Sequence, residues 1–300
     1  MDNNQKSGYN YFMNNITVKA WAKINLTLDV LGKRPDGYHE LSTVMQTVSL
    51  YDTIEIEKTT SPGIKLTTNC PDIPTDENNL AYKAAQLLVK GHGVFIHIKK
   101  NIPISAGLAG GSSDCAAVLH GLNKLFSLSI PEKKLLEIGR DFGADVPFCL
   151  MGGTAKAGGI GERLDPLPPH PAVSIVIARL PILVSTKEMF AKWSGAIRSE
   201  NQTPEMVKAI ISGDINKIAD NLANDLAPIA TGLHPEILEL ITAFREQGAL
   251  GVNMTGSGPA IFAYFPTEVN AIKAIKHIGQ KFTDCEMFCT QPKRSMSNDG

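Results

Sequence analysis

The sequence has few of the features that mark membrane, secreted or nucleic-acid-binding proteins. Its 300 residues contain no run near the ~18 consecutive apolar residues that a membrane span needs, and the polar start lacks the apolar core of a signal peptide. Its 29 Lys and Arg balance 30 Asp and Glu, giving a net charge of −1, so there is no broad basic field for nucleic acid or anionic lipid. We therefore expect a cytoplasmic protein that binds neither nucleic acid nor a membrane.

Cysteine is also scarce, with five residues scattered along the chain. A small, odd number argues against a disulfide scaffold, so reduced thiols are expected. Cys285 and Cys289 are four positions apart, but no second ligand pair stands near them to complete a zinc site. We interpret both as strand residues, and the sequence names no metal ligand.

Apolar residues make up 43% of the chain, which is enough for ordinary hydrophobic cores. From Ile16 to Val30 the even positions are apolar and the odd ones mostly polar, the period of a half-buried strand or strand pair. Lys23 and Asn25 share the face opposite the apolar stripe. Leu41–Leu50 and Thr53–Glu57 also predict strands, so this region is expected to be β-rich and antiparallel.

Helices and strands are mixed along the rest of the chain, without strict alternation. Helices are predicted near residues 80–88, 115–126, 131–138, 187–193, 205–211, 236–247 and 269–278, and strands at 94–98, 174–178, 260–265 and 286–290. This mixture predicts the α+β class. Because four prolines lie between Leu164 and Pro171, we place a linker there. The expected organisation is a polar leader (1–15), an N-terminal domain (16–165) and a C-terminal domain (166–300).

The most informative stretch is a Gly-rich loop, Pro103–Asp114, between a predicted strand and an amphipathic helix. Small residues let backbone N–H groups approach an anion, a helix N-terminus favours negative charge, and serine hydroxyls can reach phosphate or a metal ion. The alternative is a flexible linker capped by Ser113 or Asp114. The loop lacks both the Gly-Lys-Ser/Thr of the common P-loop and the Gly-x-Gly-x-x-Gly of dinucleotide folds, so it predicts a phosphate site of another kind.

Three segments of the chain resemble the motifs of the GHMP kinases, the family of galactokinase and of homoserine, mevalonate and phosphomevalonate kinases. The Gly-rich loop resembles their Pro-x-x-x-Gly-Leu-Gly-Ser-Ser-Ala signature, Ala20–Leu26 resembles their N-terminal motif, and Asn253–Ala260 resembles their C-terminal motif. Arg34–Leu41 and Gly143–Phe148 further resemble one branch of the family, whose substrate is a cytidine-diphosphate-linked methylerythritol.

The resemblance implies an N-terminal ribosomal-protein-S5-domain-2-like domain, a ferredoxin-like α+β C-terminal domain, and an active site in the cleft between them. The implied reaction transfers a phosphoryl group from ATP to the 2-hydroxyl of that small-molecule cytidylyl substrate, in the non-mevalonate pathway to isoprenoid precursors. Mg²⁺ would be held through the ATP phosphates and water. A monomer or weak homodimer is expected.

The resemblance also assigns roles to individual residues. Lys23 and Asp145 are the implied catalytic pair, with a solvated strand lysine and a helix cap as the alternatives. The implied ATP-binding residues are Pro103, Ile104, Ser105, Ala106, Gly107, Leu108, Ala109, Gly110, Gly111, Ser112 and Ser113. The implied substrate-binding residues are Asn25, Tyr38, His39, Phe190, Gly256, Ser257 and Gly258.

The substrate-binding residues have plainer alternatives. Tyr38 and His39 would bind the cytosine, but otherwise fit a turn, and Phe190 would be its second aromatic neighbour, but otherwise fits a helix core. Two rival functions also remain. One is another GHMP kinase, which the Tyr38–His39 pair argues against; the other is an ATP-binding regulator without catalysis, which the presence of both Lys23 and Asp145 argues against.

Overall fold

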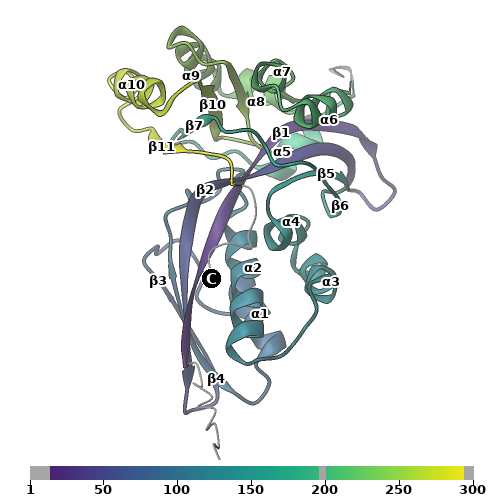
Figure 1. The fold of residues 1–300 in the computed structure, drawn as a ribbon, viewed down its shortest axis with the longest axis vertical. Helices are drawn as coiled ribbons and strands as arrows, with labels where there is room; N and C mark the ends of the chain where they lie inside the picture. The colour runs from purple at the N-terminus through teal and green to yellow at the C-terminus, as the bar shows by residue number, and fades with distance from the viewer. Residues whose placement is uncertain (1–13, 196–200, 294–300) are drawn as a thin grey trace, which may run out of the picture.

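Two sheets, each covered by helices, form the part of the chain that the computed structural model describes, residues 14–195 and 201–293 (Figure 1). Residues 1–13 of the predicted leader lie outside this part. Asn15, which was assigned to the leader, is already the first residue of a strand.

The first sheet has seven strands in the order β3-β4-β2-β1-β8, with β5 paired to β2 and β6 paired to β5. Its strands are β1 (Asn15–Lys33), β2 (His39–Thr59), β3 (Gly63–Thr68), β4 (Gly93–Lys99), β5 (Thr154–Gly159), β6 (Arg163–Pro166) and β8 (Ala223–Asn224). The two longest strands, β1 and β2, form an antiparallel hairpin that runs from the lower part of the molecule into the upper part (Figure 1). The segments predicted as two strands at 41–50 and 53–57 are both part of β2.

Four helices cover one face of this sheet (Figure 1). They are α1 (Leu80–Leu88), α2 (Gly110–Leu125), α3 (Glu132–Phe142) and α4 (Val146–Met151). The central helix, α2, buries Val118, Leu119 and Leu122 in one core with Ile54 and Ile96 of the sheet. This packing fixes the N-terminal end of α2, and with it the Gly-rich loop, against the sheet.

The second sheet is antiparallel, in the order β11-β7-β10-β9. Its strands are β7 (Ser174–Arg179), β9 (Gly251–Met254), β10 (Ile261–Phe265) and β11 (Glu286–Thr290). The helices around it are α5 (Thr186–Lys192), α6 (Thr203–Ser212), α7 (Ile215–Asp220), α8 (Ala227–Leu233), α9 (Pro235–Glu246) and α10 (Glu268–Ile278). Across the sheet, the last of these strands in the sequence comes first, followed by the first, the third and the second. This 4-1-3-2 order is the predicted ferredoxin-like arrangement.

The two halves share a packed junction. The chain passes from the first sheet to the second between Pro166 and Ser174, next to the predicted boundary, and that boundary stays a prediction. The segment 164–171, predicted as a linker, lies at the connection between the two sheets, but its first residues belong to the edge strand β6 and its His170 is buried. His170 donates from Nδ1 to its neighbour's carbonyl and accepts from the Tyr264 hydroxyl at Nε2, over 3.0 Å, and burial lowers the pKa of His170 to about 4. The neutral imidazole therefore joins the connecting segment to β10, while the His170 backbone N–H donates to Thr154 Oγ1 of β5 over 3.2 Å.

The prediction of a half-buried first strand was wrong, since both faces of its central part are buried. Ala20 packs into the core beneath α2, whereas Ala22, Ile24 and Leu26 pack into a core shared with the second sheet, and a register shift after Trp21 separates the two groups. Alternation in sequence cannot reveal that a strand is covered by different elements on its two faces.

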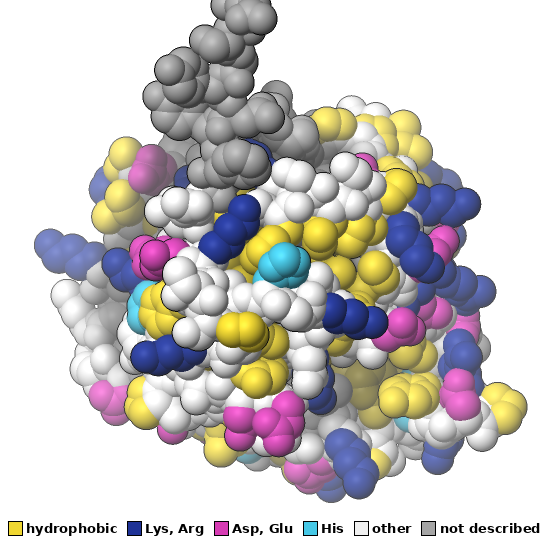
Figure 2. Space-filling view, turned by 90° about the horizontal axis from the view of Figure 1, so that it is seen from below, with side chains coloured by type: hydrophobic (Ala, Val, Ile, Leu, Met, Phe, Trp, Pro, Cys, Tyr) yellow, Lys and Arg dark blue, Asp and Glu magenta, His cyan; other side chains and the backbone are white. Residues whose placement is uncertain are grey.

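The surface fits the balanced charge of the sequence. Lysine and arginine side chains are interspersed with aspartate and glutamate on the face shown in Figure 2, without a broad field of one sign. Among the described helices, none has the length and apolar character that a membrane span requires.

Candidate active site

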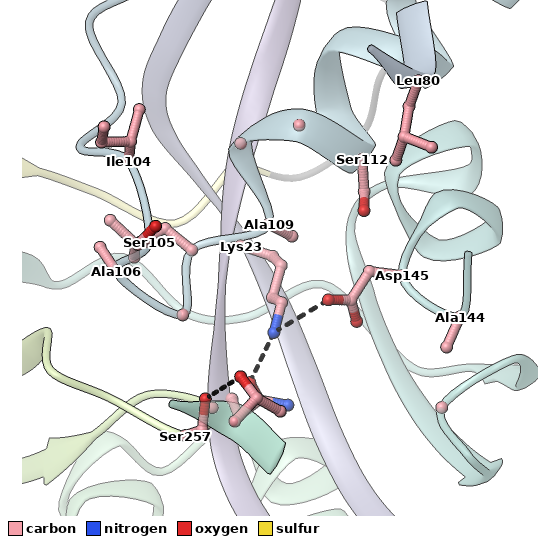
Figure 3. Close-up of a pocket in the computed structure, with 18 of the residues that line it drawn as sticks. Lys23, Leu80, Ile104, Ser105, Ala106, Ala109, Ser112, Ala144, Asp145 and Ser257 are labelled. Atoms are coloured by element: carbon pink, nitrogen blue, oxygen red, sulfur yellow. Dashed lines mark hydrogen bonds and ion pairs between the residues drawn. The ribbon is translucent and has the colours of Figure 1, made fainter. Parts of the chain in front are cut away.

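A cavity of about 590 Å³ opens where the Gly-rich loop of the first half meets the second half (Figure 3). Most of the residues predicted for the site line it. These are Lys23, Asn25, residues 103–112, Asp145, Phe190, Gly256 and Ser257. Both halves of the chain therefore contribute to one cavity, as expected for a site in the cleft between them.

Lys23 lies in the middle of β1 with only 4% of its surface exposed. Its Nζ donates a 2.7 Å hydrogen bond to Asn25 Oδ1 and lies 3.7 Å from Asp145 Oδ2. Figure 3 shows the ammonium and the carboxylate pointing toward one another, with the Ser112 hydroxyl directed into the same space. Register shifts on both sides of Lys23 and Asn25 interrupt the pairing of β1 with β2. The alternative of a solvated strand lysine is excluded.

Asn25 is held in one orientation by neighbours from both halves. Its Nδ2 donates to Thr43 Oγ1 over 2.9 Å, and its backbone N–H donates to Thr255 Oγ1 over 3.0 Å. Because the amide nitrogen is occupied by Thr43, the amide oxygen is left to face Lys23. Asn25 thus positions the ammonium group while also lining the cavity.

Asp145 precedes α4 at the helix N-cap position, but its side chain makes no capping hydrogen bond. The side chain is 34% exposed and lines the cavity. A carboxylate that only capped the helix would be bonded to the first backbone N–H groups. The capping alternative therefore does not describe Asp145, whose carboxylate is free to meet a ligand.

The Gly-rich loop is shaped by close contact with the segment after β9. Ala109, with φ of +58°, forms the N-cap of α2, and the Lys23 N–H donates to the Leu108 carbonyl over 3.1 Å. Gly107 has φ of +76°, and a Cβ there would lie 2.4 Å from the Thr255 carbonyl oxygen, so a side chain is excluded at this point. Gly111 differs, because a Cβ at that position would meet nothing within 4 Å. The loop leaves open space above the start of a 16-residue helix.

Ser113 is not brought to the cavity. It is buried in α2, and its hydroxyl donates to the Trp21 carbonyl oxygen and lies 3.3 Å from Cys149 Sγ. Consecutive helical residues point about 100° apart, so Ser112 and Ser113 cannot both face the same space. Ser113 joins the helix to β1 instead.

The predicted cytosine-binding residues are only partly assembled. Phe190 lines the cavity, and His39 stacks on it with ring centroids 5.1 Å apart, while Tyr38 is 61% exposed and lies outside the cavity lining. Burial, together with the charge of Lys33, lowers the pKa of His39 and favours the neutral imidazole. Gly258 also lies outside the lining, next to Ser257, whose hydroxyl shares a 2.7 Å hydrogen bond with Thr186 Oγ1.

Sequence reasoning missed several residues of the cavity. Lys100 and Asp114 line it, and so does a segment before α1 that includes Ile73 and Asn79. Asp114 had a visible signal, because it ends the Gly-rich loop and the motif, but the sequence assigned its side chain no role other than a helix cap. Lys100 had none, since its position depends on contacts with residues far away in the sequence.

Two parts of the chain match a known protein family. Residues 79–153 match the GHMP kinases N terminal domain, and residues 206–284 match the GHMP kinases C terminal domain. The chain is 50% identical over 287 residues to 4-diphosphocytidyl-2-C-methyl-D-erythritol kinase of Caldicellulosiruptor saccharolyticus, covering 94% of this chain and 99% of that protein.

Solved structures show the same similarity. A crystal structure of 4-(cytidine 5'-diphospho)-2C-methyl-D-erythritol kinase matches with a TM-score of 0.80 and 33% identity, over 93% of this chain and 100% of the other. Homoserine kinase from Cytophaga hutchinsonii matches in fold, with a TM-score of 0.77 and 20% identity over 96% of this chain and 97% of the other. Both structural matches therefore cover more than nine-tenths of this chain.

Proposed function

The chain belongs to the GHMP kinases and, within them, to the 4-diphosphocytidyl-2-C-methyl-D-erythritol kinases, and from this membership we propose how its own residues act. The predicted family, two-domain fold and enzyme class are confirmed. The reaction is the ATP-dependent phosphorylation of the 2-hydroxyl of 4-diphosphocytidyl-2-C-methyl-D-erythritol, a step in isoprenoid precursor synthesis.

The observation that carries the proposed mechanism is the pairing of Lys23 with Asp145 in the cavity. As the 2-hydroxyl oxygen bonds to the γ-phosphorus, the bond from that phosphorus to the ADP oxygen breaks, and the hydroxyl proton passes to Asp145. Lys23, held by Asn25, places positive charge beside the transferring group. Positioning and charge stabilisation supply most of the rate enhancement in reactions of this type.

ATP is proposed to bind with its phosphates at the Gly-rich loop, where Gly110 and Gly111 begin α2. Among the described residues, no group of three His, Cys, Asp or Glu side chains is arranged to enclose a metal ion. The cavity, whose lining includes the Asp145 carboxylate, fits a Mg²⁺ ion that would arrive bound to the phosphates and keep water as its other ligands. When bound, the ion would neutralise phosphate charge.

The cytidylyl group is proposed to bind at Phe190, His39 and Tyr38, with the substrate diphosphate near Gly256, Ser257 and Gly258. The face of Phe190 now covered by the His39 ring is a stacking surface for a base. A base that stacks there takes the place of the His39 ring. The neutral imidazole can then donate or accept a hydrogen bond at the pyrimidine edge.

Substitution of Gly111 by alanine tests the ATP site without disturbing the fold. The added methyl group meets no protein atom, so the free energy of unfolding should stay the same or rise by up to ~1 kcal/mol. Because Gly111 lines the cavity, the added methyl group should crowd the bound phosphates and weaken ATP binding by about 1–3 kcal/mol, or roughly 5- to 150-fold. Calorimetry with Mg-ATP measures the loss.

A matched control for this experiment is Gly232→Ala in α8, where a Cβ also meets nothing within 4 Å. Gly232 lies outside the cavity lining, so ATP affinity should be unchanged. If Gly111→Ala binds ATP with wild-type affinity, the phosphates do not bind at the start of α2.

Substitution of Phe190 by leucine tests the cytosine site. Loss of base stacking should weaken the binding of the cytidylyl substrate by about 1–3 kcal/mol and leave the KM for ATP unchanged. Phe282→Leu, a half-buried aromatic residue packed elsewhere in the second half, is the control. Steady-state kinetics with each substrate varied in turn separates the two sites. If only the KM for ATP rises, the base does not stack on Phe190.

The compartment and the assembly state are also proposals. The five cysteines are all free thiols, which fits the reducing cytoplasm. A monomer or weak homodimer is proposed from the family resemblance, and light scattering after size exclusion would measure it.

A further inference from the structure

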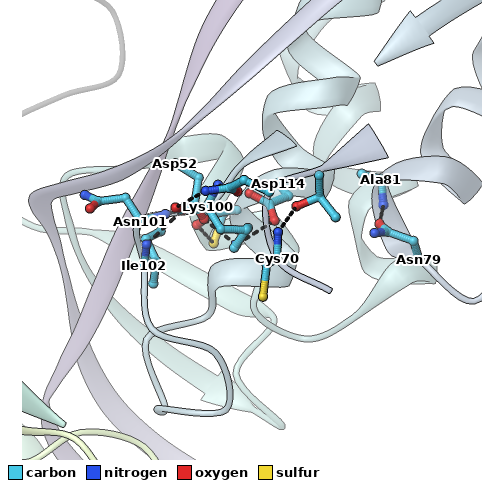
Figure 4. A network of polar contacts seen from close by, with 12 residues as sticks. Asp52, Cys70, Asn79, Ala81, Lys100, Asn101, Ile102 and Asp114 are labelled. Carbon is cyan, nitrogen blue, oxygen red and sulfur yellow. Dashed lines mark hydrogen bonds and ion pairs between the residues drawn. The ribbon is translucent and has the colours of Figure 1, made fainter. Parts of the chain in front are cut away.

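Three charged side chains form a buried cluster where β2, the end of β4 and the start of α2 meet (Figure 4). Lys100, which follows β4, donates from Nζ to Asp52 of β2 and, over 2.7 Å, to Asp114 of α2. All three side chains are at least nine-tenths buried. A Cβ on Gly110 would lie 3.2 Å from Lys100 Nζ, so the cluster lies immediately under the first residue of α2.

The two carboxylates of the cluster are not equivalent. Asp52 accepts hydrogen bonds from the backbone N–H groups of Asn101 and Ile102 as well as from Lys100, so three donors stabilise its negative charge. The Oδ2 atom of Asp114 accepts a hydrogen bond from Lys100 Nζ, whereas its Oδ1 atom is buried without a hydrogen-bond partner in the structure. One cation therefore faces two anions, and Asp114 is the anion with fewer hydrogen-bond donors to stabilise its charge.

The electrostatics of the cluster agree with its geometry. Burial raises the pKa of the Asp114 carboxyl to about 7, the Lys100 ammonium opposes this rise, and the Asp52 carboxylate adds to it. The other titratable groups near Asp114 are the buried thiols of Cys115 and Cys149, whose pKa values are raised by burial, so both stay neutral. Asp114 is thus the group in this cluster that can change charge near neutral pH.

We propose that Asp114 takes up a proton when ATP binds, so that the nucleotide phosphates and one proton enter the site together. The inference rests on the proposed placement of ATP phosphates at the Gly-rich loop. The proton comes from solvent and adds to Asp114 Oδ1, the oxygen that lacks a partner, and the net charge of the cluster changes from −1 to zero. Lys100 then faces a single carboxylate, and more of its positive charge acts on the phosphates above Gly110.

The direction of the pH dependence follows from linkage. Phosphate charge above the cluster disfavours the ionised form of Asp114, so the pKa of Asp114 is higher in the ATP complex than in the free enzyme. Below the free-enzyme pKa, Asp114 is protonated in both states, and this group gives ATP affinity no pH dependence. Between the two pKa values affinity falls by up to about tenfold per pH unit, and above both it is constant again.

The test is calorimetry of Mg-ATP binding at pH 7.5 in buffers of different ionisation enthalpy, without the acceptor substrate. The dependence of the binding enthalpy on the buffer gives the number of protons taken up. We expect wild-type protein to take up a fraction of a proton more than Asp114→Asn, which keeps the side-chain shape but cannot titrate. The affinity of wild-type protein should fall about three- to tenfold between pH 7 and 8.5, while that of Asp114→Asn changes less. Proton changes of the ligand itself cancel in this comparison.

Asp141→Asn, an exposed carboxylate of α3, is the control and should behave as wild type. Equal proton uptake by wild type and Asp114→Asn would overturn the inference while leaving ATP binding, and thus the proposed function, intact. Absence of ATP binding by wild-type protein would instead overturn the placement of ATP. If Asp114→Asn does not fold, wild-type protein alone decides, because no uptake beyond that of Mg-ATP itself would contradict the proposal.

Discussion

Replacement of Asp145 by asparagine should lower kcat by about 10²- to 10⁴-fold, because the acceptor of the substrate hydroxyl proton is lost. Asparagine keeps the size of the side chain and its place beside Lys23. The Asp145 side chain makes no capping hydrogen bond and is partly exposed, so stability should change by no more than ~0.5 kcal/mol. Nucleotide binding should be nearly unchanged, since the Gly-rich loop is intact.

Rapid-quench measurement of a single turnover separates the chemical step from product release in this variant. Asp165→Asn, an exposed carboxylate on the edge strand β6, is the matched control and should turn over as wild type. Turnover of Asp145→Asn at the wild-type rate would remove Asp145 from proton transfer. A large loss of stability would instead assign Asp145 a structural role.

Replacement of Lys23 by methionine should lower kcat by about 10²- to 10³-fold, the range seen when one preorganised donor to a developing charge is removed. Methionine fills a similar volume in this buried position but carries no charge. The hydrogen bond to Asn25 Oδ1 is lost as well, which should cost about 1–3 kcal/mol of stability because the oxygen is buried. The KM for ATP should rise less than kcat falls, since the loop still binds the phosphates.

Lys156→Met, an exposed lysine of β5, is the control for charge removal and should leave kcat unchanged. The double variant of Lys23 and Asp145 gives a second check. When two residues act as a unit, the double variant loses less activity than the product of the losses in the two single variants. Fully multiplicative losses would show that the 3.7 Å contact between them has no part in catalysis.

Local patterns in the sequence predicted the elements that carry the chemistry. The small residues of the Gly-rich loop precede an apolar stripe, which is enough to predict a loop that feeds a helix. Alternation along β1 placed Lys23 and Asn25 on one face, and they do lie side by side, joined by a hydrogen bond. Several short elements, such as the strands β8 and β3 and the six-residue helix α4, were not predicted, because so few residues carry little periodicity.

Features that depend on contacts between distant residues were not predictable. The burial of Lys23 requires both the loop and the second half of the chain to cover β1. The ion cluster joins Asp52 of β2, Lys100 after β4 and Asp114 of α2, which are adjacent only once the first sheet has formed. The inward direction of Ser113 depends on how α2 is rotated against β1, and a sequence motif does not specify rotation.

The most direct test of the central claim is product formation by mass spectrometry with Mg-ATP. Purified protein is offered 4-diphosphocytidyl-2-C-methyl-D-erythritol, homoserine, mevalonate and phosphomevalonate in parallel, with Asp145→Asn as the negative control. The account predicts a singly phosphorylated product and ADP from the cytidylyl substrate alone, with the new phosphate on the 2-hydroxyl. Phosphorylation of another alcohol, or ATP binding without any phosphorylated product, would contradict it.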